Sequence, residues 1–324
     1  MQLPPPLFDA LTALLEGVPR KDLATAARAL SEGYRAGRPS HAIATRTAAL
    51  AYAVSRMPAT HAACAAVFAR LAQVMPDWRP ASLLDVGAGT GAASWAAVTQ
   101  WPDLRTMTML EPNAALRSLA QDLAEEGPLA RAQFFSAKLD AEKPQADLVV
   151  ASYVLAELAE DAAAQVARDL WRGANGALAL IEPGTPQGFA RIRAARAALI
   201  AAGAHVAAPC THDSACPMRS VGASRSDQNK VDDWCHFSQR LARSRDHMLL
   251  KDAHVPFEDE RYSYLVVTRQ KAASGARILA PPLEAKPGLT FKLCDDTGLR
   301  AQFVATRDRG AYRRVRKRSW GDLF

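Results

Sequence analysis

Leu84-Asp85-Val86-Gly87-Ala88-Gly89-Thr90-Gly91 is a short apolar strand that runs into a glycine-rich turn. A helical pattern follows it directly, from Ala92 to Gln100. Glycines in such a turn let the backbone bend sharply and let a ligand approach it within contact distance. A strand, a glycine turn and a helix in this order are typical of nucleotide-binding α/β sheets. The stretch therefore predicts a cofactor loop at the end of the first strand.

Strand and helix patterns alternate along the chain on either side of this loop. Strands are predicted at Ser82–Val86, Thr106–Leu110, Gln133–Phe135, Leu148–Ser152, Ala177–Ile181, His205–Ala208 and Tyr262–Thr268. Helices are predicted at Ala92–Gln100, Ala114–Glu126, Glu160–Arg172 and Phe189–Ala202. This order predicts a doubly wound α/β fold. With the late strand inserted, it is the seven-stranded Rossmann-like sheet of S-adenosylmethionine (SAM) methyltransferases.

Composition changes along the chain predict three regions. Residues 1–78 are Ala-rich with apolar side chains at helical spacing, so they predict a helical N-terminal domain. Residues 79–271 form the predicted SAM-binding domain, which contains a cysteine-bearing, metal-binding insert at 209–260. Residues 272–324 predict a small, β-rich and basic C-terminal domain that binds RNA.

Side chains around the glycine turn favour SAM over a nicotinamide or flavin cofactor, which stays the alternative. Asp85 can accept hydrogen bonds near the cationic amino acid of SAM, and Glu111 ends the second strand where a carboxylate can hold ribose hydroxyls. The residues predicted to bind the cofactor are Asp85, Gly87, Ala88, Gly89, Thr90, Gly91, Glu111 and Ser152.

The sequence predicts no catalytic residue. The fourth strand ends in Ser152-Tyr153-Val154-Leu155, without the Asn/Asp-Pro-Pro-aromatic turn that many amino-methylating enzymes of nucleic acids carry there. Pro209-Cys210 resembles the Pro-Cys of cytosine C5 enzymes, whose thiolate adds to the ring. It follows a later strand, so we do not favour Cys210 as a nucleophile.

Four of the five cysteines lie in the last 115 residues of the chain, namely Cys210, Cys216, Cys235 and Cys294. Four thiolates are the ligand set of a structural zinc ion or an iron–sulfur cluster. Zinc knuckles normally use a Cys-x-x-Cys turn, which this chain lacks, so the irregular spacing favours the cluster. His212 or His236 could replace one cysteine around zinc, and four unrelated thiols are the remaining alternative. Cys64, within an Ala-rich helix, is predicted to be a core residue.

The formal net charge of +7 is concentrated near the end of the chain. Seven Lys or Arg side chains and a single acid lie between Arg307 and Arg318, with Tyr312 among them. Basic and aromatic side chains together suit phosphate contact and base stacking, although a solvated surface face is the alternative. The residues predicted to bind RNA are Arg313, Arg314, Arg316, Lys317 and Arg318.

Neither a secretory signal nor a long uncharged apolar run is visible, so we expect no membrane association and a cytoplasmic location. In a reducing compartment, clustered cysteines indicate metal rather than disulfides. We expect no DNA partner.

The chain resembles the methyltransferase-like proteins associated with small-ribosomal-subunit assembly, which are known from mitochondria and have bacterial relatives. The resemblance covers roughly residue 79 to the end, and its most specific motifs are Pro209–Pro217 and Asp233–Ser238. It implies a SAM-binding fold, a 4Fe-4S cluster on Cys210, Cys216, Cys235 and Cys294, and association with small-subunit ribosomal RNA. It implies the same glycine loop, with Gly87, Gly89 and Gly91.

Two functions follow from these features. The first is a SAM-dependent methyltransferase (EC 2.1.1.-) acting on small-subunit ribosomal RNA, and the second is a non-catalytic RNA-binding assembly factor with the same fold. A small-molecule methyltransferase is less favoured, because it would leave the basic tail without a purpose. We also expect the metal on Cys294 to tie the RNA-binding tail to the sheet.

Overall fold

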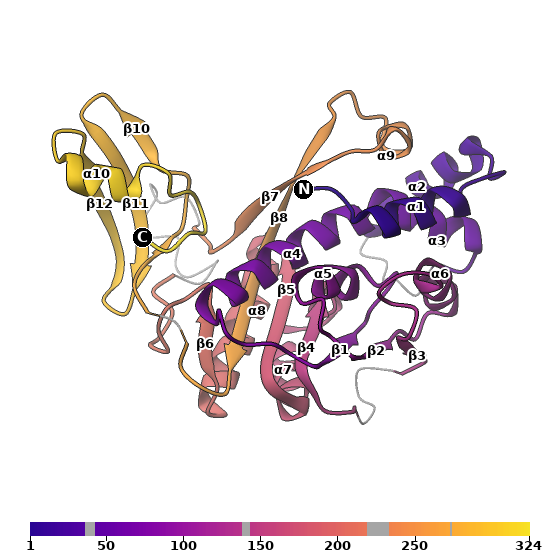
Figure 1. Ribbon diagram of the computed structural model, residues 1–324, viewed down its shortest axis with the longest axis horizontal. Coiled ribbons are helices and arrows are strands. Elements are labelled where there is room, and N and C mark those ends of the chain that lie inside the picture. The colour runs from indigo at the N-terminus through magenta and orange to yellow at the C-terminus, as the bar shows by residue number, and fades with distance from the viewer. Residues whose placement is uncertain (36–42, 138–142, 219–232, 273) are drawn as a thin grey trace.

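The computed structural model describes residues 1–35, 43–137, 143–218, 233–272 and 274–324. The strands of its large sheet are β1 (Ser82–Val86), β2 (Thr106–Leu110), β3 (Gln133–Phe135), β4 (Ala146–Ser152), β5 (Ala174–Pro183), β6 (His205–Ala208), β7 (Phe237–Ala242) and β8 (Phe257–Thr268). Within the described residues their order is β3-β2-β1-β4-β5-β8-β6, with β7 paired to β8 (Figure 1). Strands β1 to β5 are parallel, whereas β8 is antiparallel to β5, β6 and β7.

This order confirms the predicted Rossmann-like methyltransferase sheet, including the late strand inserted between β5 and β6. The predicted bounds of β1, β2, β3 and β6 are those observed. Strands β4, β5 and β8 are longer than predicted, because their ends carry small or polar residues that weaken the apolar pattern while still pairing with neighbours.

Helices cover both faces of the sheet, and alternate side chains of each strand enter one of two cores. On one side lie α5 (Ala92–Gln100) and α6 (Ala114–Ala124), and on the other α7 (Glu160–Gly173) and α8 (Pro186–Ala201). In β4, Leu148 and Val150 enter the first core, whereas Val149 and Ala151 enter the second. Both faces are therefore apolar, as expected of a parallel sheet between helices.

The predicted N-terminal helices are α1 (Pro5–Leu14), α2 (Arg20–Arg35), α3 (Arg46–Ser55) and α4 (Met57–Val74). Helix α4 packs against α5 and β8 across the sheet (Figure 1). Its residues Phe68 and Leu71 belong to the same apolar cluster as Trp95 of α5 and Val266 of β8. The boundary at residue 78 stays a prediction, and the apolar core is continuous across it.

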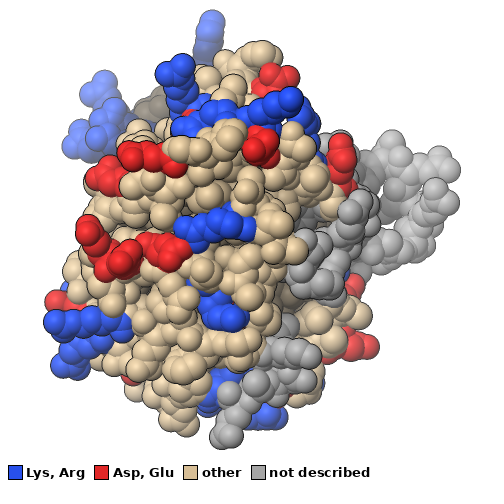
Figure 2. Space-filling view, turned by 90° about the vertical axis from the view of Figure 1, so that its right-hand side faces the viewer, with Lys and Arg blue, Asp and Glu red and all other residues tan. Residues whose placement is uncertain are grey.

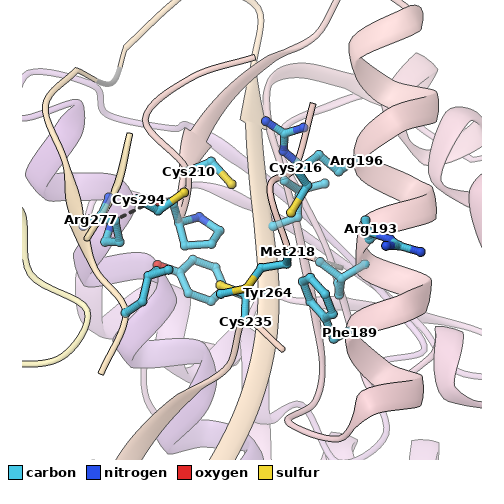
Figure 3. A pocket seen from close by; sticks show the side chains of 14 residues that line it. Phe189, Arg193, Arg196, Cys210, Cys216, Met218, Cys235, Tyr264, Arg277 and Cys294 are labelled. Atoms are coloured by element: carbon cyan, nitrogen blue, oxygen red, sulfur yellow. Dashed lines mark hydrogen bonds between the residues drawn. The ribbon is translucent and has the colours of Figure 1, made fainter. Parts of the chain in front are cut away.

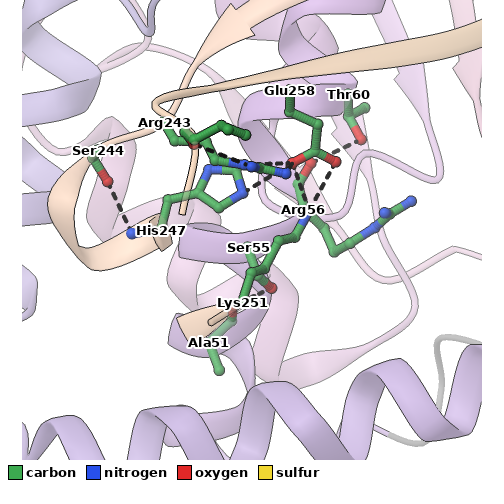
Figure 4. Close-up of polar contacts among 10 residues, drawn as sticks. Ala51, Ser55, Arg56, Thr60, Arg243, Ser244, His247, Lys251 and Glu258 are labelled. Atoms are coloured by element: carbon green, nitrogen blue, oxygen red, sulfur yellow. Dashed lines mark hydrogen bonds and ion pairs between the residues drawn. The ribbon is translucent and has the colours of Figure 1, made fainter. Parts of the chain in front are cut away.

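Strand β7 and the first half of β8 form an arm that extends beyond the sheet and carries α9 (Arg245–Leu250) at its end (Figure 1). The sequence prediction treated this segment as part of a loop-rich insert, whose residues 219–232 lie outside the described part. The arm is fixed by Glu258, whose carboxylate lies 2.8 Å from Lys251 Nζ, 3.2 Å from Arg243 Nη2 and 3.3 Å from His247 Nε2 (Figure 4). Burial opposes ionisation, yet the bonds from His247 and Lys251 hold the pKa of Glu258 below its ordinary value.

The C-terminal region is a second, small antiparallel sheet with its own core, as the predicted β-rich domain required. Its elements are β9 (Arg277–Ile278), β10 (Leu283–Ala285), β11 (Gly288–Asp295), β12 (Gly298–Ala305) and α10 (Arg309–Val315). Its core contains Phe291, Leu293 and Val315. Within the described residues, every helix is too short or too polar to cross a bilayer.

Candidate cofactor loop and four-cysteine site

The loop between β1 and α5 uses glycine where no other residue fits. Gly87, Gly89 and Gly91 have φ angles of 70°, 56° and 84°, which side chains rarely adopt. A Cβ atom on Gly87 would lie 2.5 Å from Val154 Cγ2, and one on Gly91 would lie 2.6 Å from Met109 Cε. The backbone is therefore packed closely on both sides of the loop.

Asp85 is fully buried beneath this loop rather than exposed to solvent. Its Oδ2 accepts hydrogen bonds from the Ser94 backbone N–H at 3.1 Å and the Ser94 hydroxyl at 2.7 Å. Its Oδ1, like Thr90 Oγ1, is buried without a partner among the described residues. Burial raises the pKa of Asp85 to about 7, although the bonds from Ser94 oppose the rise. Two unpartnered buried oxygens at the loop fit a polar ligand there.

Glu111 lies where the sequence predicted a carboxylate, at the end of β2, and is 7% exposed. Its Oε2 accepts from Gly89 N–H at 2.8 Å and its Oε1 from Asn113 N–H at 2.7 Å. Glu111 thus holds the glycine loop against the end of β2. Its proposed contact with ribose hydroxyls stays a prediction, since both oxygens already accept backbone hydrogen bonds.

The turn after β4 is held by polar side chains of Tyr153 and Glu182, next to the predicted cofactor residue Ser152. Tyr153 has a φ of 61°, and its hydroxyl donates to Glu260 Oε1 at 2.7 Å. Glu182, fully buried at the end of β5, accepts from Leu155 N–H at 2.7 Å. Burial raises the pKa of Glu182 to about 8. Ser152 lies beside the buried thiol of Cys64. Tyr153 and Ser152 thus contact neighbouring protein groups, whereas Glu182 Oε2 is buried without a partner among the described residues.

All four predicted cysteines line one pocket between the sheet and the C-terminal region (Figure 3). Cys210 and Cys216 lie in the loop after β6, Cys235 precedes β7, and Cys294 lies in β11. The structure therefore brings together residues from three distant segments. Cys64 lies elsewhere, fully buried in α4, as predicted.

The described residues contain no group of three His, Cys, Asp or Glu side chains close enough to bind a single metal ion. The thiols nevertheless influence one another. Burial, with smaller contributions from the nearby Cys210 and Cys216, raises the pKa of Cys294 to about 12. Burial also raises the pKa of Cys235 well above its ordinary value, with Cys210, Cys216 and Cys294 adding to the effect. Ionising these thiols together would require a cation among them.

The two histidines proposed as alternative ligands lie in different surroundings. His212 is 5% exposed, and its Nε2 lies 3.7 Å from Cys294 Sγ. His236 instead stacks on Trp234 and contacts Trp320 edge-on. His212 is thus adjacent to the cysteine pocket, whereas His236 is part of an aromatic cluster.

Arg196 and Arg277 also line the pocket, and the sequence analysis missed both. They are 5% and 1% exposed. Burial raises the pKa of the Cys210 thiol, and the charge of Arg196 opposes the rise. Arg196 lies in a helix with other arginines and Arg277 follows a loop, which are positions typical of surface residues, so the sequence offers no signal for their burial.

The five basic residues predicted to bind RNA are all exposed, in α10 and the turn that follows it. At the far end of the molecule, near α3 and α6, acidic and basic side chains are interspersed and separated by uncharged surface (Figure 2). Among the described residues of that face both signs of charge occur, whereas the five predicted residues at the end of the chain are all basic.

The sheet order and the glycine loop define a Rossmann-like α/β protein of the methyltransferase type. Residues 46–324 match the family described as mitochondrial small ribosomal subunit Rsm22. The chain belongs to this family.

Two relatives show how far the similarity extends. The chain is 29% identical over 304 residues to the ribosome assembly protein METTL17, mitochondrial, of Homo sapiens, covering 86% of this chain and 63% of that protein. It is 26% identical over 328 residues to the Rsm22-cox11 tandem protein 2, mitochondrial, of Schizosaccharomyces pombe, covering 85% of this chain and 43% of that protein. The chain thus spans less than two thirds of either relative.

Among solved structures, the chain is similar to magnesium protoporphyrin IX methyltransferase from Synechocystis with bound SAM. The TM-score is 0.42 and the identity 15%, over 65% of this chain and 80% of that one. A likeness this low says nothing about substrate or cofactor.

The expected cytoplasmic location is wrong by these comparisons. The family and the relatives are described as mitochondrial. The expectation rested on seeing no targeting pattern near Met1. The absence of such a pattern is weak evidence about the compartment.

Proposed function

We propose that this protein binds small-subunit ribosomal RNA and acts in assembly of the small ribosomal subunit. Family membership and the description of METTL17 as a ribosome assembly protein support the proposal. The structural observation that carries it is the position of the exposed basic residues of α10. They belong to the same small domain as Cys294, so the four-cysteine pocket lies at the base of the RNA-binding element.

The test is crosslinking in cells followed by sequencing of the attached RNA. Crosslinks should concentrate in small-subunit ribosomal RNA and its precursors, and they should map to peptides within 307–318. Crosslinks distributed over messenger and transfer RNA in proportion to abundance would contradict the proposal.

The four cysteines hold a metal centre in this proposal, and a 4Fe-4S cluster fits them better than zinc. A cluster bonds each thiolate to a different iron, so its ligands lie farther apart than those of one ion. That requirement agrees with four cysteines that surround one pocket without being close enough to share an ion. Cys210, Cys216, Cys235 and Cys294 would hold the cluster, which would lower the cost of ionising their buried thiols.

SAM is the ligand proposed for the glycine loop. The unpartnered oxygens of Asp85 and Thr90 support a polar ligand, and the left-handed glycines support close backbone approach. When bound, SAM would supply a transferable methyl group. This chain's own residues would bind and orient it, through Gly87, Ala88, Gly89, Thr90 and Gly91 of the loop and through Asp85, Glu111 and Ser152 around it.

Methyl transfer to the RNA is the second candidate function, and the glycine loop is the observation that favours it. The Tyr153 hydroxyl, which already donates to Glu260, favours the non-catalytic alternative instead. Incubation with labelled SAM and small-subunit precursor particles separates the two. Incorporation into RNA would establish transfer, whereas RNA binding without incorporation would establish a binding factor.

A further inference from the structure

Two buried arginine side chains lie in a pocket whose lining is otherwise mainly apolar and thiol. Arg277 is 1% exposed and Arg196 is 5% exposed. Their neighbours in the lining include Phe189, Ile192, Met218, Leu265 and Leu279. A guanidinium ion remains charged under all ordinary conditions, so burying one without an anion is costly. Two such ions in one pocket indicate that the pocket binds a negatively charged group.

Both arginines donate hydrogen bonds to neutral carbonyl groups, and Arg196 also contacts the Cys210 thiol. Arg277 Nε donates to Pro209 O at 2.7 Å and its Nη1 to Gly321 O at 2.9 Å. Arg196 Nη2 donates to His212 O at 2.7 Å. Arg277 Nη2 and Arg196 Nε are buried without a partner among the described residues. Donors therefore remain for a group that the pocket would bind.

Charge counting identifies that group. Four cysteine thiolates carry four negative charges, and either a zinc ion or an oxidised 4Fe-4S core carries two positive charges. The centre is then a dianion, which two buried guanidinium ions would neutralise. We propose that Arg196 and Arg277 are the counter-charges of a dianionic tetrathiolate metal centre. The inference rests on the metal centre proposed above.

Arg277 would also position one of the ligands. It lies opposite Cys294 in the β9–β11 ladder, while its guanidinium binds the carbonyl of Pro209, the residue before Cys210. One side chain thus joins the strand that carries Cys294 to the loop that carries Cys210. Lysine at position 277 would keep the charge but not the two divergent hydrogen bonds.

The experiment compares variants of the full chain purified without oxygen. Arg196→Met and Arg277→Met remove a charge, Arg196→Lys and Arg277→Lys retain it, and Arg193→Met is the matched control. Arg193 lines the same pocket but is half-buried, and Figure 3 shows it pointing away from the sulfur atoms. Iron and zinc per chain are measured by elemental analysis, followed by the rate of metal loss to excess chelator. Circular dichroism establishes that each variant is folded.

We expect Arg196→Met and Arg277→Met to lose metal about tenfold faster or more, as changes around metal ligands commonly do. Arg196→Lys should stay near the wild type, whereas Arg277→Lys should be intermediate because it keeps only the charge. If the metal is iron, the Met variants should also have a more negative reduction potential, since a neighbouring cation favours the added electron.

Wild-type rates and potentials in folded Arg196→Met and Arg277→Met would overturn the inference and leave the metal centre intact. An unfolded Arg277→Met leaves the test to Arg196→Met, which makes no link between the cysteine-bearing segments. A wild-type chain that holds neither iron nor zinc would overturn the metal centre and the inference together.

Discussion

Arg70 Nη1 in α4 lies 2.6 Å from Asp322 Oδ1 near the end of the chain. This ion pair joins the N-terminal helices directly to the segment beside the cysteine pocket. Both side chains are largely buried, at 26% and 19% exposed. Asp322 also accepts from Ser319 N–H at 2.8 Å. Together with the bond between the Thr211 hydroxyl and Gly275 O, this ion pair holds the C-terminal region without any metal.

We predict that Arg70→Met destabilises this attachment. Breaking a partly buried pair leaves an uncompensated carboxylate, which we expect to cost about 1–2 kcal/mol. Urea unfolding should show the loss, and limited proteolysis should release the C-terminal region sooner. The exposed pair Arg172 and Asp169 is the control, and Arg172→Met should change stability by less than about 0.5 kcal/mol. Equal effects of the two substitutions would contradict the assigned role.

The same contacts modify the expected role of Cys294. The sequence predicted that metal bound to Cys294 ties the tail to the sheet. Contacts between side chains and backbone groups of the same chain also do so. We therefore predict that Cys294→Ser loses metal and weakens RNA binding, while the C-terminal region stays attached. Metal analysis and limited proteolysis on the same sample test this. Faster release of the region in Cys294→Ser than in Arg70→Met would contradict this and show that metal is the main link.

Two buried carboxyl groups make stability depend on pH. Burial raises the pKa of Asp85 to about 7 and that of Glu182 to about 8. The folded chain then retains protons that the unfolded chain has released above roughly pH 4, so these two groups lower stability as pH rises from there to about 8. Burial lowers the pKa of His61 to about 4, which acts in the opposite direction up to roughly pH 6.5. Asp85→Asn should reduce this fall by an amount on the order of 3 kcal/mol. Denaturation of the wild type and of Asp85→Asn at pH 5, 6, 7 and 8 measures it, and the same pH dependence in both proteins would refute the assignment.

Much of the fold could be predicted from local sequence, because the periodicity of apolar residues and the positions of glycines indicate where strands, helices and turns begin and end. The bounds of β1, β2 and α5 are those predicted, since each begins or ends at a turn residue or a change of pattern. The β7–β8 arm was missed for a physical reason. Most of its side chains are polar and at least partly exposed, with Phe237 and Leu241 of β7 buried. Ion pairs of Glu258 with Lys251 and Arg243 stabilise it, and such pairs have no periodic pattern.

The cysteines of the pocket could be predicted from the sequence, but the residues that surround them could not. Cysteines in polar loops are conspicuous, so Cys210, Cys216 and Cys235 could be grouped from the sequence alone. The burial of Arg277 could not be foreseen, because it depends on Pro209 and Gly321, which are distant in sequence. Likewise, nothing local shows that Asp85 binds Ser94 and leaves one oxygen unpartnered.

The basic tail should contribute electrostatic RNA affinity in proportion to its charge. We predict that the triple change Arg313→Gln, Arg314→Gln and Arg316→Gln weakens RNA binding and lowers the slope of log affinity against log salt by about 2, for single-stranded contacts. Filter binding to small-subunit RNA at several salt concentrations measures the slope. The control is Arg105→Gln, Arg131→Gln and Arg172→Gln, which removes equal charge from exposed sites elsewhere. Equal slopes for the two triple variants would exclude the tail as the RNA contact.

The metal centre should be visible as soon as the protein is isolated without oxygen. We predict a brown protein with broad absorbance at roughly 400 nm, from charge transfer between thiolates and ferric iron. Cys210→Ser, Cys216→Ser and Cys235→Ser should each lose most of the colour and the iron. Cys64→Ala should keep both, because Cys64 is buried in α4 and does not line the pocket. A colourless protein with one zinc per chain would show that the thiols move together around a single ion, against the spacing that favours a cluster.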